Sequence, residues 1–407
     1  MLPLCSALAL QLARDAGIQL YVAGARLGGC ALVALEPIAK DAVVLTVADS
    51  YYRQTAQPTD PHVRTVARQL GCGSTELLAV QVLLGQVSEE VKTWFELMPS
   101  GDQIPNYYSL PASAKQSIVG KTHFRPLGER LEAEFECTKY AMERLGSSAN
   151  VNTTDADIAR ALTFVSLATQ PVGGMDHPDA ADGFLLPVAL AFTPATEITA
   201  NVVQDAESPL VFRAARNIAK GETLNFDLLG PTGNLETMLR FGFEVSGNVH
   251  VGRSFDLTGE PAQAQCPPVT LRSDGALVSS AFECHRLARV RAFTAQFGSI
   301  TQAELDKEHL ALRHAVAQAC HQMRKMITGH GQSPAQGDAS TTGRLVRLLD
   351  AEMNTLLRCE REFLYKKQTL TEPPVSDRVS PDAAKHTAPF SLFMETFDLV
   401  AKRGLVQ

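Results

Sequence analysis

The order of strand-like and helical sequence constrains the fold of this chain more than any single motif. Residues 18–48 are predicted to form short strands, because apolar residues alternate there and glycines such as Gly24 and Gly28 mark turns. Residues 61–170 instead carry apolar residues at helical spacing, for example over Ala112–Gly120. Asn152–Asp155 is a suitable capping segment for a further helix from about Asp157 to Thr169. Strand-like sequence returns at 184–228. This order predicts a β-rich unit that is split by inserted helices.

The remainder of the chain is predicted to be largely helical. A short helix is expected over Asn234–Phe241, and short strands are expected over Val269–Arg272 and Ala276–Val278. Three long helices are expected to follow, at Ala281–Gln296, Gln302–Ile327 and Thr342–Gln368. Helices of this length indicate a separate domain of packed helices after the β-rich part.

These patterns predict an α+β fold with three parts. The β-rich core combines residues 1–60 and 180–246, and residues 61–179 form a helical insert within it. Residues 250–407 form a mostly α-helical C-terminal domain. A chain of 407 residues is long enough for two or three domains.

The composition excludes several classes of protein. Apolar residues make up 45% and charged residues 20%, which is typical of a globular protein and not of a disordered chain. The net charge of -7 gives no overall basic field for nucleic acid, although a local basic patch stays open. The longest apolar run, Phe184–Phe192, is about half of the ~20 residues that a membrane helix needs, and it contains Pro187. No membrane association is therefore expected.

The cysteines give no sign of a metal site. No two of the eight lie closer than 18 residues, so neither a zinc knuckle nor a CxxC motif is present. Scattered cysteines in a chain of this size predict reduced thiols and an intracellular, reducing compartment, with the mitochondrion and the cytoplasm both left open. The eight are Cys5, Cys30, Cys72, Cys137, Cys266, Cys284, Cys320 and Cys359.

Six segments occur in the order expected of one known family. They are Leu27–Val44, Thr93–Pro99, Leu186–Ala189, Phe212–Glu222, Asn234–Phe243 and Arg358–Glu362. The chain resembles the SET-domain protein methyltransferases, in particular the Rubisco large-subunit lysine methyltransferase-like group. The resemblance covers nearly the whole length. It implies a β-rich SET core with a helical insert, followed by a helical domain that binds the protein substrate.

The resemblance also implies an S-adenosylmethionine site, but two of its groups have changed here. The family has a glycine pair whose backbone comes close to the cofactor, and this pair falls on Gly29 and Ala31. An arginine that pairs with the cofactor carboxylate would fall within Val165–Thr169. The chain has no arginine between Arg160 and Arg213, so a shifted alignment does not supply one.

Two further groups of the family's site have changed as well. An Asn-His pair that holds the cofactor's ammonium group and adenine aligns with Thr193 and Pro194. Proline has no N–H, so any backbone donor at that place is lost. The tyrosine that orients the substrate amine aligns with Leu229, and no tyrosine occurs from residue 141 to 364.

Together these changes predict a degenerate active site with no catalytic residue and no bound cofactor. The preferred hypothesis is a pseudoenzyme: a SET-fold module for protein–protein interaction or assembly. Its partners would bind the C-terminal helical domain and the groove between domains, within a large complex such as an organellar ribonucleoprotein. In that setting the chain would be an assembly factor in an RNA-containing complex. The alternative is an active protein-lysine N-methyltransferase that uses S-adenosylmethionine.

Other charged clusters favour structural explanations. His309, His314, His321 and His330 lie near Glu304 and Glu308, but no pair has metal-ligand spacing, so no metal is expected. A basic stretch with His285 could instead contact phosphate or an acidic partner; its arginines are Arg286, Arg289 and Arg291. In the last long helix, basic and acidic residues mix and predict a solvated face with ion pairs. They are Arg344, Arg347, Arg358, Arg361, Lys366 and Lys367, with Asp350, Glu352, Glu360 and Glu362.

Overall fold

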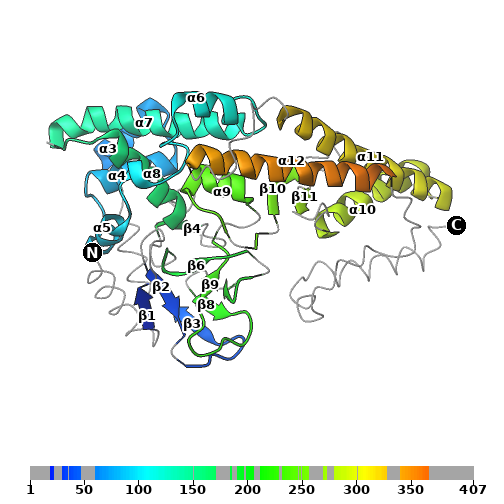
Figure 1. Ribbon diagram of the computed structural model, residues 1–407, viewed down its shortest axis with the longest axis horizontal. Coiled ribbons are helices and arrows are strands. Elements are labelled where there is room, and N and C mark those ends of the chain that lie inside the picture. The colour runs from blue at the N-terminus through cyan, green and yellow to red at the C-terminus, as the bar shows by residue number, and fades with distance from the viewer. Residues whose placement is uncertain are drawn as a thin grey trace. The chain divides into compact units, whose positions relative to one another are not determined.

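The chain divides into two compact units (Figure 1). Unit 1 comprises Met1–Asn248 and Gly331–Val346, and unit 2 comprises Val249–His330 and Arg347–Gln407. Residues 331–346 thus group with unit 1, whereas the sequence places them in the C-terminal helical domain. The computed structural model describes residues 19–22, 30–34, 36–46, 60–149, 151–170, 184–185, 190–196, 199–205, 211–228, 232–245, 247–248, 250–255, 269–272, 279–299, 301–327 and 340–365.

The sheet of unit 1 joins strands from both sides of the helical insert. Its strand order is β3-β8-β7-β9-β6, so β3, which precedes the insert, pairs with β8, which follows it. The strands are β3 (Val43–Thr46), β6 (Thr193–Pro194), β7 (Val202–Gln204), β8 (Val211–Ala214) and β9 (Asn225–Phe226). The pairs β3–β8 and β7–β8 are antiparallel, whereas β9 runs parallel to β6 and β7. The expected α+β fold with a split β core is therefore confirmed.

Two smaller strand pairs belong to the same unit. An antiparallel pair joins β1 (Gln19–Val22) and β2 (Cys30–Val33), as the alternating sequence predicts. Another joins β4 (Thr169–Gln170), directly after the insert, and β5 (Phe184–Leu185).

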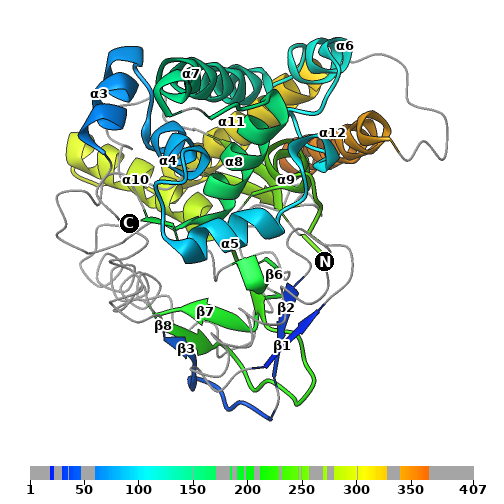
Figure 2. The ribbon, with the colours of Figure 1, turned by 90° about the vertical axis from the view of Figure 1, so that its left-hand side faces the viewer.

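The helical insert packs against this β core. Its α-helices are α3 (Pro61–Leu70), α4 (Ser74–Leu83), α5 (Glu89–Leu97), α6 (Ala112–Ala114), α7 (Arg125–Ala149) and α8 (Asp155–Ala168). Figure 2 shows these helices on one side of unit 1 and β3, β7 and β8 on the other. Trp94 of α5 and Phe164 of α8 share one buried core with Phe212 of β8. In that core the rings of Phe212, Phe192 and Phe226 lie 5.2–5.6 Å apart.

Local signals set the ends of several helices. The Thr154 side chain accepts a hydrogen bond from the Asp157 N–H, and the Asp157 carboxylate accepts one from the Thr154 N–H, which caps α8 as the sequence predicts. Helix α9 (Asn234–Phe241) has the bounds expected from the sequence, because Gly242 adopts φ +80° and ends it. The expected helix at 112–120 is instead the short α6 and a π-helical turn at Lys115–Val119.

Among the described residues, unit 2 contains one strand pair, two whole helices and the part of a third helix from Arg347 onward. The strands are β10 (His250–Phe255) and β11 (Val269–Arg272), and the helices are α10 (Ser279–Phe297), α11 (Gln302–Ile327) and α12 (Thr341–Tyr365). The sequence predicts β11 and the helices but not β10, whose segment has no alternating pattern. The neighbouring prediction of a strand at 276–278 lies outside the described residues.

The prediction of reduced thiols is wrong for cysteines in both units. Cys72 and Cys137 form a disulfide between the end of α3 and helix α7, with Cα atoms 5.7 Å apart. Cys320 and Cys359 form another between α11 and α12, and both are fully buried. Cys284 is also disulfide-bonded. The pairs lie 65 and 39 residues apart in sequence, so spacing alone did not reveal them. The compartment stays a prediction.

Candidate functional site

Strand β6 carries the two residues aligned with the family's Asn-His pair. The Thr193 N–H donates to the Leu224 carbonyl at 3.0 Å, and the Ala195 N–H donates to the Phe226 carbonyl at 3.0 Å. Thr193 therefore lies beside Asn225, and Pro194 beside Phe226, in parallel register. Both neighbours belong to the segment that leads to Leu229, which itself lies outside the described residues.

The free edge of β6 has no backbone donor at Pro194. Successive N–H groups of a strand point to opposite edges, and those of Thr193 and Ala195 both point to β9. The N–H of residue 194 would point to the other edge, which ends the described part of this sheet. Proline has none. Pro194 therefore lacks an N–H on the edge of the sheet that the other described strands leave unpaired.

Leu224 links β6 to the strand that carries the altered glycine pair. Its N–H donates to the Leu32 carbonyl at 2.8 Å, and its carbonyl accepts from Thr193. Ala31 precedes Leu32 in β2 and lies opposite Tyr21, whereas Gly29 lies outside the described residues. Leu224 is therefore hydrogen-bonded both to β2, which contains Ala31, and to β6, which contains Thr193.

An apolar helix end lies where the resemblance would place the cofactor-binding arginine. Helix α8 ends at Ala168, and Val165, Leu167 and Ala168 are buried. The Thr169 hydroxyl donates to the Val165 carbonyl at 2.7 Å. This stretch offers no cation for a carboxylate.

The nearest arginines in sequence already have partners within the protein. Arg160 donates from Nη2 to the carbonyls of Phe95, Glu96 and Met98 at 2.7–3.0 Å, which satisfies the end of α5. Its guanidinium also lies 4.5 Å from the centre of the Phe95 ring. Arg213 is paired with Asp205. The sequence did not suggest this capping role for Arg160, because its partners are backbone atoms more than 60 residues away.

Two tyrosines of unit 1 are likewise held by the insert. The pKa of Tyr107 is raised to about 12, mainly by burial. Glu132, which is hydrogen-bonded to the Tyr107 hydroxyl, raises it further. Lys115 lies 4.6 Å from the Tyr107 ring and 3.2 Å from Glu132. The Tyr108 ring packs against Phe135 at 5.7 Å, and burial raises its pKa well above the usual value. Both hydroxyl groups thus remain protonated in their packing sites.

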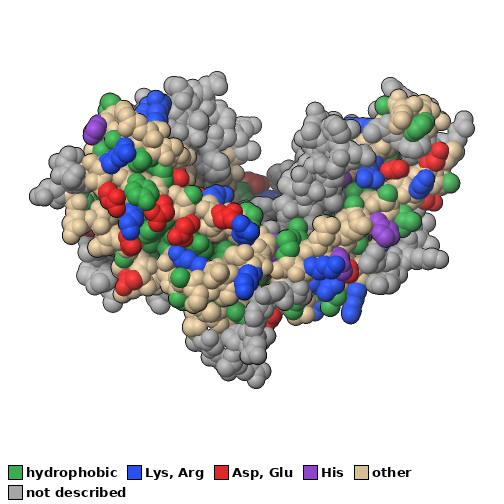
Figure 3. All heavy atoms as spheres, turned by 90° about the horizontal axis from the view of Figure 1, so that it is seen from above, with side chains coloured by type: hydrophobic (Ala, Val, Ile, Leu, Met, Phe, Trp, Pro, Cys, Tyr) green, Lys and Arg blue, Asp and Glu red, His purple; other side chains and the backbone are tan. Residues whose placement is uncertain are grey.

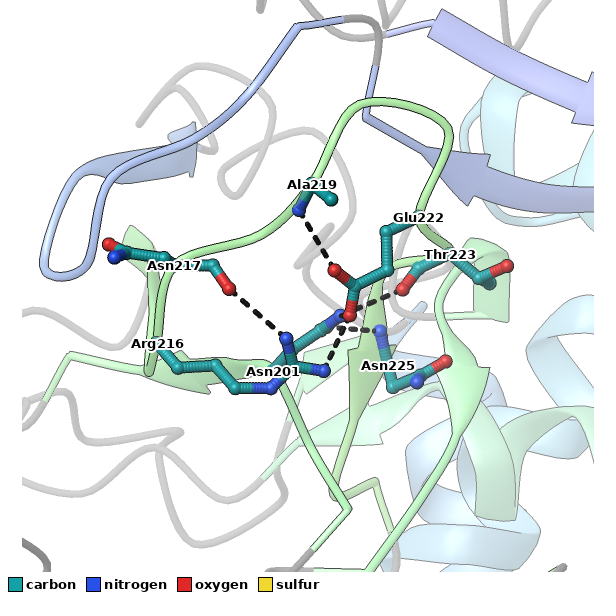
Figure 4. A network of polar contacts seen from close by, with 7 residues as sticks. All are labelled: Asn201, Arg216, Asn217, Ala219, Glu222, Thr223 and Asn225. Carbon is teal, nitrogen blue, oxygen red and sulfur yellow. Dashed lines mark hydrogen bonds and ion pairs between the residues drawn. The ribbon is translucent and has the colours of Figure 1, made fainter.

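A polar network surrounds Glu222 in the connection between β8 and β9 (Figure 4). The Glu222 carboxylate accepts hydrogen bonds from Arg216, from Asn201 and from the Ala219 N–H. The fully buried Asn201 also donates to the Thr223 carbonyl at 2.8 Å and accepts from the Asn225 N–H at 2.6 Å. The hydrogen bond from Arg216 is the main cause that lowers the pKa of Glu222 to about 2. These contacts stabilise the β8–β9 connection, whose segment R-N-I-A-K-G-E does not form an open site.

The histidine cluster of unit 2 does not form a metal site in the part of the chain that the structure describes. The His321 ring lies 2.9 Å from Glu360, which also accepts from Arg324 at 2.9 Å. Burial raises the pKa of Glu360, but the hydrogen bonds from Arg324 and His321 outweigh it and lower the pKa overall. Glu304 accepts from the Thr301 N–H at 2.8 Å and so caps α11. His330 lies outside the described residues.

The described side chains of the basic stretch on α10 do not form one open patch. His285 is buried, and Arg289 pairs with Glu308 at 3.2 Å. Only Arg291 of this group has a side chain described as exposed. Every helix within the described ranges is too short or too polar to cross a membrane.

Solved structures with the same fold support the family resemblance. The SET domain of LSMT bound to lysine and AdoHcy aligns with 89% of this chain and 91% of its own, with a TM-score of 0.54 and 13% identity. Rubisco LSMT bound to AdoMet aligns with 88% and 91%, with a TM-score of 0.54 and 14% identity. Rubisco LSMT bound to sinefungin and monomethyllysine is similar to the same degree, at a TM-score of 0.53 and 13% identity.

Neither a family model nor a curated protein sequence matches the chain. At this level of identity the structural likeness concerns the fold and not the activity. The strand order, the helical insert and the alignment over most of both chains lead to one conclusion: the protein has the SET fold in the arrangement of Rubisco LSMT.

Proposed function

We propose that this chain is a non-catalytic SET-fold protein that binds other proteins as an assembly or scaffold module. The proposal rests on a contrast: polar groups such as Arg216 and Glu222 are hydrogen-bonded within the protein, whereas the positions that the resemblance aligns with the cofactor site carry other residues. Pro194 gives the edge of β6 no N–H, and the segment around Val165 is apolar and buried. Leu229 replaces the tyrosine by sequence.

Among the described residues, those aligned with the cofactor site provide poor partners for S-adenosylmethionine. Its carboxylate would need a cation, but Arg160 is held by three carbonyls and Arg213 by Asp205. A lost charge-assisted hydrogen bond of this kind costs about 1.5–3 kcal/mol, which is roughly tenfold to more than a hundredfold in affinity.

An active protein-lysine N-methyltransferase is the alternative, because the neighbours in fold were solved with AdoMet or AdoHcy. Titration of the purified chain with S-adenosylmethionine by calorimetry separates the two functions. We expect no heat of binding at micromolar ligand and no transfer of labelled methyl to protein in a cell lysate. Micromolar binding together with methyl transfer to any protein would overturn the non-catalytic role.

The helical unit 2 is the proposed place of partner binding. A large complex, such as an organellar ribonucleoprotein during assembly, is a suitable setting for such a module. Co-purification of tagged chain with chemical cross-linking and mass spectrometry tests this. We expect cross-links from the C-terminal helices to a protein; cross-links confined to unit 1 would contradict it.

A further inference from the structure

The two disulfides whose cysteines are both described differ in their exposure. Cys320 and Cys359, which join α11 to α12, are both 0% exposed. Cys72 and Cys137, which join the end of α3 to α7, are both half-buried. A disulfide is reduced when a thiolate attacks one of its sulfur atoms, so the rate depends on access to that sulfur. Of these two bonds, Cys72–Cys137 is therefore the one that a reductant reaches more easily in the folded protein.

The charges near Cys137 favour neither an anionic nor a cationic reductant. On the face of unit 1 that Figure 3 shows, acidic and basic side chains are interspersed. Cys137 itself lies between Glu136 and Lys139, and Lys139 pairs with Asp155 at 3.0 Å. We therefore expect access to the sulfur atoms, and not charge, to decide how fast this bond is reduced.

Helix α3 is packed in unit 1 through one narrow apolar side. Its buried residues are Val63, Val66 and Ala67. These three side chains share one buried cluster with residues of α4 and α7, namely Leu77, Val80, Ala141, Met142 and Leu145. The contact of α3 with the rest of the insert thus depends on a small apolar cluster and on the disulfide.

The polar contacts at the two ends of α3 add little to this packing. At its start, the Gln86 side chain donates to the Asp60 carboxylate at 3.4 Å, which is long for a hydrogen bond. At its end, Gly71 adopts φ +73° and terminates the helix, and Cys72 follows directly. The disulfide from Cys72 to Cys137 is therefore the covalent link that holds the end of α3 against α7.

Loss of this link is expected to let α3 open locally. The disulfide spans 65 residues of sequence, and a cross-link of this kind favours the folded form by about 30-fold to 1,000-fold. Without it, a helix of 10 residues, which is marginal by itself in water, depends on three buried side chains. Its opening would uncover Leu77 and Val80 of α4.

We infer that the Cys72–Cys137 disulfide is a redox-sensitive cross-link, which a dithiol reductant opens so that α3 separates from α7. One thiolate of the reductant attacks a sulfur atom of the bond, forms a mixed disulfide and displaces the other cysteine as a thiolate. The second thiol of the reductant then breaks the mixed disulfide, so two electrons pass to the protein and the reductant becomes a disulfide.

The intracellular location that the sequence predicts fits this role, because disulfides of intracellular proteins are usually transient or redox-sensing. The inference goes beyond the proposed protein-binding role and does not depend on it.

Thiol trapping with the full, folded chain tests the difference between the two bonds. The chain is incubated with dithiothreitol, free thiols are alkylated with iodoacetamide at successive times, and mass spectrometry measures the modified fraction of each cysteine. We expect Cys72 and Cys137 to be modified at least about tenfold faster than Cys320 and Cys359. Oxidised dithiothreitol, added before the alkylation, should restore the Cys72–Cys137 bond.

Limited digestion with trypsin tests whether reduction releases α3. Arg64 and Arg68 lie in this helix, and a protease cleaves a helix only when it opens locally. Cleavage after these two arginines should become about tenfold faster or more when the chain is reduced. The variant Cys72→Ser/Cys137→Ser should be cleaved at the fast rate both with and without dithiothreitol.

The matched variant Cys320→Ser/Cys359→Ser retains the cross-link of α3, so dithiothreitol should still accelerate its cleavage after the two arginines. Circular dichroism shows whether each variant is folded, and the comparison of oxidised with reduced wild type needs no variant. The inference is wrong if the two disulfides are reduced at equal rates or if reduction leaves the cleavage of α3 unchanged. It is also wrong if dithiothreitol accelerates the cleavage of folded Cys72→Ser/Cys137→Ser as much as that of the wild type.

Discussion

The β8–β9 connection and the region of β6 and the end of α8 lie in the same unit but differ in their polar groups. The connection contains Arg216 and Glu222, which are hydrogen-bonded to each other and, through Asn201, to the backbone. In the other region, which we call the β6 region, the resemblance aligns Thr193 and Pro194 with two polar groups of the family and an apolar helix end with a third.

The difference lies in where each side chain finds its partner. A buried polar group whose partner is in the protein cannot be lost without leaving that partner unsatisfied, so folding itself retains it. A group whose partner is a ligand contributes little to stability, and it is free to change once the ligand is no longer bound. The residues of the β8–β9 connection are therefore informative about the fold. Those of the β6 region bear on whether a cofactor is bound.

The largest effect is expected at the centre of the retained network. Asn201→Ala should lower the free energy of unfolding by about 3 kcal/mol, because it leaves the buried Asn225 N–H and the Thr223 carbonyl without this partner. Thr193→Ala is the matched change on the other region and should cost less than about 1 kcal/mol. Urea unfolding of both variants measures the two values. Equal losses would erase the distinction between the regions.

A somewhat smaller loss of stability is expected on substitution of Arg160. Arg160→Ala should cost about 2 kcal/mol, since three carbonyls at the end of α5 lose their donor and Phe95 loses a stacked cation. Arg160→Lys should recover only part, because lysine cannot bridge three carbonyls and lie flat on a ring. Arg125→Ala, which breaks only an exposed pair, should be nearly neutral in the same thermal melts. Full recovery by lysine would show that charge alone matters.

The next largest effect is the pH dependence of the stability that Glu222 provides to the β8–β9 connection. The pKa of Glu222 is lowered to about 2, so its stabilising contribution is present above the ordinary glutamate value of 4.5 and is lost as the pH falls towards 2. The melting temperature of Glu222→Gln should therefore lie below that of the wild type at pH 6. The two curves should converge by pH 2–3. A gap that stays constant over this range would show that the carboxylate charge is not the source of stability.

The smallest effect is expected at the positions that the resemblance aligns with the cofactor site. The variant Thr193→Asn/Pro194→His/Leu229→Tyr restores three family residues, yet we expect no useful affinity for S-adenosylmethionine. Ala31 and the absent arginine still leave the cofactor carboxylate without its close backbone and its charge partner. Calorimetry measures the affinity. Tight binding by this variant would indicate a recent and shallow loss of the cofactor site.

The sequence predicted those parts of the fold that depend on neighbouring residues. Gly242 ends α9 by adopting a left-handed conformation, and Thr154 starts α8 with its own side chain, so both helix ends could be located without tertiary information. The split of the β core was predictable too, because the periodicity changes from strand-like to helical and back.

The features that were missed depend on distant partners. Cys72 and Cys137 pair across 65 residues, and Arg160 reaches carbonyls in another helix. Glu360, which the sequence predicts on a solvated face, instead pairs with Arg324 of α11. The site residues Thr193 and Pro194 came from a resemblance to known motifs, and the structure adds only which edge of the sheet they occupy. Side chains with remote partners leave no periodic signal.

The Cys320–Cys359 disulfide means that the polypeptide need not be continuous for α11 and α12 to stay attached. Residues 328–339 lie between the two cysteines, in a stretch rich in glycine, serine and proline. A protease site inserted there would yield, after cleavage, two pieces that migrate as one band without reductant and as two bands with it. The cross-link thus provides a position for a tag or a cut that severs the backbone while the molecule remains in one piece.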